Sequence, residues 1–161
     1  MRRRVQSILS VVLLLTSATL LAIVAILYFR DRDDPGEPAR PTAVPGHYQL
    51  IDVLDALNDA GLKTSIGGPT SGVRSTALEA PGQLLTAGNG QIYVFVYPDI
   101  GTQESSTLDV EAADVDLTSV SGDPIETTGA TLLAKSNIAV LILNLDQASV
   151  AKAQKAVQDL P

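Results

Sequence analysis

The sequence contains no cysteine, no tryptophan and a single histidine, His47, among its 161 residues. Without cysteine the chain forms no disulfide, has no thiol nucleophile and offers no site for a cysteine-linked lipid. A Ser-His-Asp triad or a multi-histidine metal site needs imidazole groups in a pocket, and one histidine at the edge of a linker is poor material for either. These absences argue against an enzyme, and no catalytic, cofactor-binding or metal-binding residue is predicted.

Charged residues are missing from one long stretch, residues 5–29, which is rich in Leu, Ile, Val and Ala. At about 1.5 Å per residue, a helix of this length reaches roughly 37 Å, more than the roughly 30 Å of a hydrocarbon core. Residues 1–4 form a basic flank before it, and Tyr28, Phe29 and Arg30 suit the aromatic and basic edge of a membrane. The sequence therefore predicts a single transmembrane helix over residues 5–29, with the lipid bilayer as its partner.

A cleaved secretory signal is the alternative interpretation, because it also places arginines before an apolar run. The run is longer than the roughly 7–15 apolar residues of such a signal. Its small-x-x-small site Ala22 to Ala25 lies inside the run and is followed by further apolar residues. We therefore expect an uncleaved signal-anchor.

The orientation follows from the distribution of arginine. Three arginines are clustered at positions 2–4, whereas Arg30, Arg32 and Arg40 are scattered among acidic residues on the other side. Under the positive-inside rule, the tight cluster favours a cytoplasmic N-terminus and an extracytoplasmic C-terminal domain. The predicted location is thus the cell membrane, as a single-pass protein.

The stretch 30–46 reads as a linker, because prolines recur among charged residues with almost nothing apolar to bury; they are Pro35, Pro38, Pro41 and Pro45. A polyproline-like linker of this length reaches up to about 50 Å, and plain disorder with a shorter reach is the alternative.

Residues 47–161 make up the remaining domain and carry five basic against fourteen acidic residues, a net charge of −9. A domain this acidic repels nucleic acid, so a DNA- or RNA-binding function is not expected.

The apolar pattern of this domain predicts helices interleaved with hairpins. A helix over 50–57 ends before Gly61, where a left-handed conformation is required, and a short strand follows over 62–66. Strands at 83–87 and 91–97 are joined through Asn89-Gly90, a strong hairpin signal.

A weaker helix is expected over 102–115, and a second hairpin joins 127–134 to 138–145 across Lys135-Ser136-Asn137. Asp146 caps a final helix, in which Leu145 and Val150 form a hydrophobic staple. The order α-β-ββ-α-ββ-α predicts an α+β fold in which helices pack on a small antiparallel sheet.

The aromatic residues of the strand 91–97 give the candidate interaction face. Tyr93, Phe95 and Tyr97 alternate with aliphatic residues and so point to one side of the sheet, and the strand 138–145 is apolar on both faces. The second face of such a sheet needs cover. Either a helix or loop of this same domain supplies it, or the aromatic face binds a protein partner or a second copy of the chain.

Other residues give weaker indications of a functional site. The carboxylates of Asp52, Asp55 and Asp59 are expected on the solvent side of a helix, and Asp114 and Asp116 lack the spacing of a calcium loop. The glycines at 67, 68 and 72 are not followed by the Lys-Ser/Thr of a phosphate-binding loop. An enzyme that uses acidic loop residues remains an alternative function.

Two resemblances extend this interpretation. The runs 54–62, 91–99 and 138–143 resemble those of a set of uncharacterised bacterial proteins that have a membrane or lipid anchor and a small extracytoplasmic α+β domain. That resemblance implies location and architecture, and no activity. Residues 44–63 are also similar to the opening of PASTA domains, which implies a cell-wall-binding module as an alternative. The leading hypothesis is a membrane-tethered, non-catalytic domain that binds a protein or envelope component.

Overall fold

The computed structural model describes residues 44–68 and 70–161. The predicted transmembrane helix over 5–29 and its basic flank lie outside these residues, as does most of the predicted linker. Within 44–68 and 70–161, no helix has both the length and the apolar character needed to cross a membrane.

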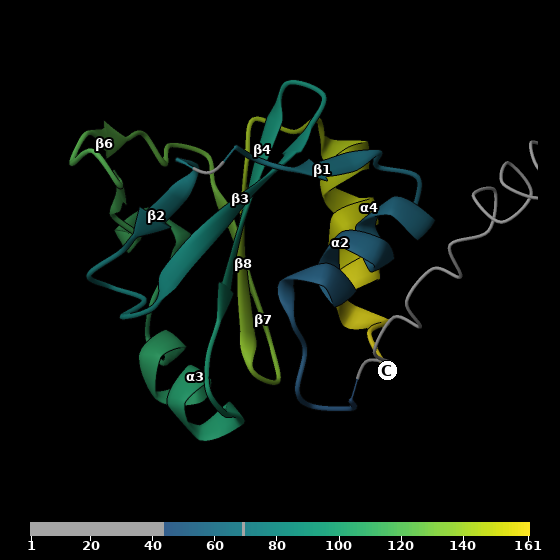
Figure 1. Cartoon of the computed structure of the whole chain (residues 1–161), viewed down its shortest axis with the longest axis horizontal. Coiled ribbons are helices and arrows are strands. Elements are labelled where there is room, and N and C mark those ends of the chain that lie inside the picture. The colour runs from purple at the N-terminus through teal and green to yellow at the C-terminus, as the bar shows by residue number, and fades with distance from the viewer. Residues whose placement is uncertain (1–43, 69) are drawn as a thin grey trace, which may run out of the picture. The chain divides into compact units, whose positions relative to one another are not determined.

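The described residues form an antiparallel α+β fold, as the sequence predicted (Figure 1). The helices are α2 (Leu50–Asp59), α3 (Ile100–Thr107) and α4 (Gln147–Gln158), with a short 3-10 turn, η1 (Ala112–Asp114). The strands are β1 (Thr64–Ile66), β2 (Gly72–Arg74), β3 (Pro81–Ala87), β4 (Gly90–Val96), β5 (Leu117–Ser119), β6 (Pro124–Ile125), β7 (Thr131–Lys135) and β8 (Ile138–Leu143). The short strands β2, β5 and β6 were not predicted, because two or three residues carry no recognisable alternation.

The sheet has the strand order β6-β5-β2-β3-β4-β8-β7, and every pairing is antiparallel. Strands β1 and β2 follow one another along the same edge of β3. Between these two strands, Gly67 N–H donates to the Leu84 carbonyl at 2.8 Å. Strand β7 ends the sheet beyond β8, so its outer edge has no neighbouring strand among the residues described.

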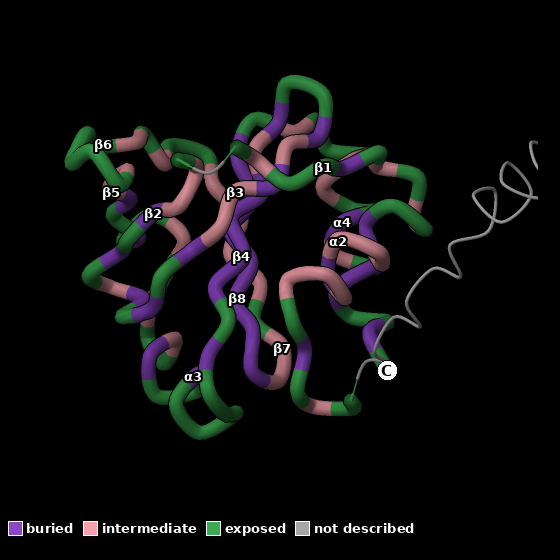
Figure 2. The backbone as a smooth tube through the Cα atoms, in the orientation of Figure 1, coloured by how far each residue is buried: buried purple, intermediate pink, exposed green. Residues whose placement is uncertain are grey.

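One face of the sheet is covered by α2 and α4, which lie together beside it (Figure 1). Their apolar stripes meet the inward residues of β3, β4 and β8 in a continuous core; its largest members are Tyr48, Leu57, Leu85, Ile92, Ile138 and Ile142. Figure 2 shows β4 and β8 buried over most of their length while the outer turns of the helices are exposed. This layer accounts for the amphipathic pattern read from the sequence.

The opposite face of the sheet is covered by loops. The segment after β2 contributes Leu78 and Ala80, and the segment from α3 to β5 contributes Val115 and Leu117. These residues pack against the second side of β4 and β8, so that all six residues of β8 are buried. The sheet is therefore a middle layer between two helices and a layer of irregular chain.

The helix signals read from the sequence are confirmed at α2 and α4. Helix α2 ends with Gly61 at a φ of +81°, where Leu62 N–H bonds the Leu57 carbonyl and Gly61 N–H bonds the Asn58 carbonyl. This is the Schellman arrangement that glycine permits. Asp146 caps α4 by accepting a hydrogen bond from Ser149 N–H at 3.0 Å.

The predicted helix over 102–115 is wrong in both limits, because α3 covers only Ile100–Thr107. Asp99 starts it earlier by accepting a hydrogen bond from Thr102 N–H at 2.8 Å. Leu108 is extended and Asp109 has a φ of +62°, so the chain leaves the helix at this point. Only a 3-10 turn at Ala112–Asp114 remains of the second half.

The turn between β3 and β4 is also shifted by one residue from the prediction. Ala87 pairs with Gly90, so Gly88 and Asn89 are the turn residues and Gly90 already belongs to β4. Gly88 has a φ of +59°, as the first residue of a II′-like turn requires. Gly90 is needed for space instead, because a Cβ atom there would lie 2.2 Å from Leu145 Cδ2.

Gly82 leaves the space that the ring of Phe95 fills. The two residues face each other across β3 and β4, and a Cβ atom on Gly82 would lie 2.6 Å from Phe95 Cε1 and 2.8 Å from Val73 Cγ2. We therefore expect Gly82→Ala to lower the free energy of unfolding by about 1–3 kcal/mol through overpacking. The matched change Gly68→Ala meets nothing within 4 Å and is expected to stay within about 0.5 kcal/mol. Equal urea midpoints for the two variants would contradict this packing.

Candidate binding surface

The aromatic face predicted from Tyr93, Phe95 and Tyr97 is not a surface. The three side chains are only 2%, 0% and 3% exposed, respectively. The Tyr97 hydroxyl donates to the Leu78 carbonyl at 2.8 Å, and burial, with a smaller contribution from Glu79, raises the Tyr97 pKa to about 12. The prediction of an exposed interaction face is therefore wrong, and the alternative that the domain covers its own sheet is the one found.

Asp116 holds part of this cover in place. Its carboxylate accepts hydrogen bonds from the hydroxyl groups of Ser75 and Thr76, at 3.1 and 2.5 Å, and from the N–H groups of Thr76 and Ala77. The hydrogen bond from the Thr76 hydroxyl is the largest cause of a lowered Asp116 pKa. The turn that begins at Ser75 leads into Leu78, so this carboxylate anchors the loop over the aromatic residues.

Because the Asp116 pKa is lowered in the folded state, its ionised form stabilises the fold. That contribution is present above the unfolded-state pKa of about 3.9 and is lost as the pH falls through the lower folded-state value. We expect Asp116→Asn to lower the urea midpoint at pH 7 and to differ less from the unmodified chain at pH 3. The exposed carboxylate of Asp114 gives the control, and an equal loss for Asp114→Asn at pH 7 would contradict the anchor.

Two other polar candidates, His47 and Asp52, lie near the start of α2. His47 is exposed and its N–H bonds the Val44 carbonyl at 2.8 Å, while Asp52 accepts a hydrogen bond from Gln49 N–H at the start of α2. In the ranges 44–68 and 70–161, no three His, Cys, Asp or Glu side chains are grouped so that they could hold a metal ion.

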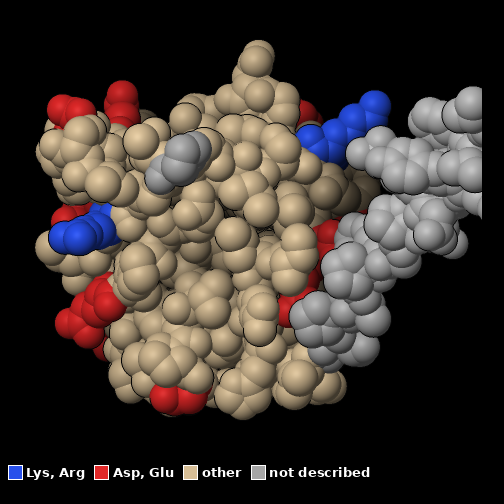
Figure 3. Space-filling view, viewed as in Figure 1, with Lys and Arg blue, Asp and Glu red and all other residues tan. Residues whose placement is uncertain are grey.

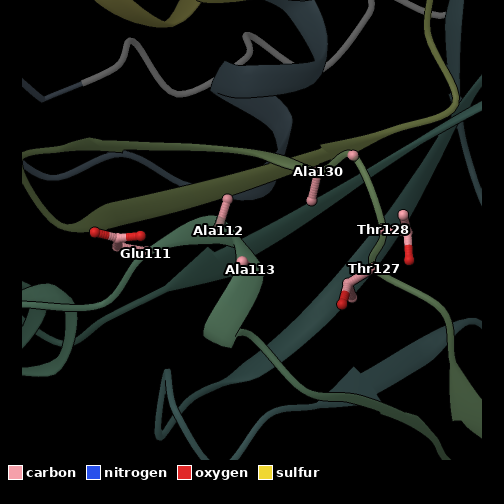
Figure 4. Close-up of a pocket in the computed structure, with 7 residues that line it drawn as sticks. Glu111, Ala112, Ala113, Thr127, Thr128 and Ala130 are labelled. Atoms are coloured by element: carbon pink, nitrogen blue, oxygen red, sulfur yellow. The ribbon is translucent and has the colours of Figure 1, made fainter.

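Two hollows lie along β7, the last strand of the sheet. The first, of about 510 Å³, is formed between η1 and the segment that leads into β7. Figure 4 shows Glu111, Ala112 and Ala113 on one side of it, and Thr127, Thr128 and Ala130 on the other. The second, of about 520 Å³, lies between the end of α3 and the end of β7 and is lined by Leu108, Asp109, Ala134 and Lys135 among others.

The two hollows have no lining residue in common but are lined by the same two stretches of chain, and we call them together the β7 groove. Residues 127–130 and 134–136, at the two ends of β7, line one side, and residues of the segment from Gln103 to Ala113 line the other. Leu108 on the second side is 71% exposed, so an apolar side chain is directed to solvent at this place. A third hollow, of about 440 Å³, lies at the β3–β4 turn and is separate from the groove.

The β7 groove is acidic. Glu104, Asp109 and Glu111 line it, and none of the three has an ion-pair partner within the described part of the chain. Lys135 also lines it, but its ammonium group donates to the carbonyl oxygens of Gln158 and Leu160 at the end of α4, 2.5 Å from each. On the face shown in Figure 3, the acidic side chains stand at the margins and the centre is uncharged.

Reasoning from the sequence missed this groove. The strand that became β7 was predicted, but its place at the end of the sheet depends on pairings with residues far away in the chain. The available signal was the pair of small residues, Ala130 directly before β7 and Ala134 within it. Comparisons with protein-family models, with curated proteins and with solved structures found no match for this chain.

Proposed function

We propose that this protein is a non-catalytic binding module that is tethered to the cell membrane by a single helix over residues 5–29. The support for the tether is the uncharged stretch itself, whose transfer from water to hydrocarbon is favourable over a length that spans a bilayer. The arginines at positions 2–4 favour a cytoplasmic N-terminus, so the domain of residues 47–161 lies on the extracytoplasmic side.

The proposed binding function rests on the β7 groove. The aromatic residues cannot serve as a docking face while they are buried, and the central strands β4 and β8 are covered on both sides. Among the described residues the outer edge of β7 has no neighbouring strand, as is also true of β6 at the other end of the sheet, and β7 in addition has a hollow near each of its ends. Edge strands of this kind are common attachment sites for partner segments.

Site-specific photo-crosslinking in intact cells tests the proposal. A benzophenone side chain is placed at Ala134 in the groove and, as a matched control, at Ser121, an exposed position in the β5–β6 turn. We expect one discrete adduct from position 134 in the membrane fraction and none from position 121. The same adducts from both positions, or no adduct from position 134, would contradict a binding function of the groove.

A further inference from the structure

The backbone of β7 is ready to accept another strand. The β7–β8 hairpin closes on the pair Lys135 and Ile138 around a two-residue turn, and hydrogen-bonded pairs alternate with non-bonded pairs along an antiparallel ladder. The N–H and C=O groups of Leu132 and Ala134 therefore point away from β8. No hydrogen bond from other backbone groups of the described residues reaches them.

The hollows match the side chains of an added strand. Ala130, directly before β7, and Ala134, within it, are four residues apart, which corresponds to about 13 Å for extended chain at about 3.3 Å per residue. Their small side chains leave the space in which the two hollows lie. Side chains at alternate positions of an extended segment beside β7 point to this face, and two of them would enter the hollows.

The charge of the β7 groove indicates which kind of polypeptide segment would bind there. Glu104, Asp109 and Glu111 supply three carboxylates to the groove, and Lys135 is engaged by the end of α4. A segment with lysine or arginine at alternate positions complements these carboxylates. A second copy of this domain is disfavoured, since it would bring the same carboxylates and a net charge of −9 to the interface.

We infer that the β7 groove binds an extended, basic polypeptide segment, which adds to the sheet as a strand next to β7. This inference rests on the proposed binding function and names the chemistry of the partner. The affinity comes from main-chain hydrogen bonds to Leu132 and Ala134, and the choice of partner comes from basic side chains that meet Glu104, Asp109 and Glu111.

Binding of short peptides to the full chain in an uncharged detergent tests the inference. The probe is fluorescein-labelled (Lys-Val)5, followed by anisotropy, and the charge control is (Glu-Val)5. Two further versions of (Lys-Val)5 carry methyl groups on backbone nitrogen atoms. The first version is methylated at every lysine, and the second is methylated at every valine. We expect (Lys-Val)5 to bind, (Glu-Val)5 not to bind, and at least one methylated version to lose binding because its donors toward β7 are blocked.

Substitutions in the chain test whether the peptide binds in the β7 groove. The double change Glu104→Gln with Glu111→Gln is expected to weaken (Lys-Val)5 binding about fivefold at low salt, the scale of two exposed charge contacts. The double change Asp59→Asn with Asp123→Asn removes the same charge elsewhere on the surface and is expected to leave the affinity within twofold. Ala134→Pro removes one outward N–H group from an edge strand, which tolerates proline, and is expected to abolish binding.

Several results would overturn the inference. Equal binding of (Lys-Val)5 and (Glu-Val)5, unchanged binding of both methylated versions, or equal loss in the two double variants would each do so. A concentration-dependent dimer in sedimentation that Ala134→Pro removes would assign the groove to a second copy instead. If no peptide binds but the photo-adduct from position 134 forms, the inference fails while the proposed function stands.

Discussion

Replacing Phe95 with alanine is expected to lower the free energy of unfolding by about 3–5 kcal/mol, the cost of removing a large buried aromatic side chain. Phe95 is 0% exposed and lies over Gly82, between the sheet and the loops that cover it. The cavity left by its ring cannot close easily, because the backbone of β3 is already in contact with it.

The measurement is urea unfolding of the full chain in uncharged detergent, followed by the near-ultraviolet circular dichroism of its tyrosines, since the chain has no tryptophan. Val96→Ala is the control, because Val96 is the next residue along β4 and is 36% exposed. We expect it to cost about 1 kcal/mol. If Phe95→Ala leaves stability unchanged, Phe95 belongs to an exposed face and the covered sheet described above is wrong.

Asn137→Ala is the second substitution with a large expected effect. The side chain of Asn137 is buried and bonds both backbone groups of Tyr48, at 2.6 Å to its N–H and 3.0 Å to its carbonyl. It also donates to the Tyr97 carbonyl at 3.1 Å. One side chain thus joins the start of the domain, the end of β4 and the β7–β8 turn.

Removing this amide leaves buried backbone groups without partners, at about 1–3 kcal/mol for each group that is not rehydrated. We expect a total loss of about 3 kcal/mol in the same urea experiment. Asn89→Ala is a matched control, because Asn89 is also the second residue of a two-residue turn but is exposed. Its change is expected to stay within about 0.5 kcal/mol, and a similar loss for both variants would contradict the bridging role of Asn137.

Asn137 also shows where prediction from the sequence ends. Its partners Tyr48 and Tyr97 are 89 and 40 residues away, so nothing in the local sequence identifies it as more than a turn residue. Gly61 and Asp146 could be assigned correctly, because a helix end is determined by backbone geometry and by hydrogen bonds within one turn. Helix ends, which depend on neighbouring residues, could therefore be predicted from the sequence, and hydrogen bonds between distant residues could not.

The same distinction between local and long-range interactions explains why the candidate interaction face was predicted only in part. The alternation of Tyr93, Phe95 and Tyr97 correctly placed them on one face of a strand. Whether that face meets solvent depends on the loops that carry Leu78 and Val115, which have no regular pattern to read. The β7 groove could not be predicted either, because an edge strand is defined by the order of the whole sheet.

The central claim is that the chain is attached to a membrane with its domain on the extracytoplasmic side. The absence of cysteine makes this directly measurable, because a single introduced cysteine is the only thiol in the protein. Intact cells that produce the full chain with Ser121→Cys or with Arg3→Cys are treated with a membrane-impermeant maleimide, and the membrane fraction is analysed. We predict labelling of Ser121→Cys in intact cells and of Arg3→Cys only after lysis. Labelling of Ser121→Cys only after lysis, or recovery of the chain in the soluble fraction, would contradict the account.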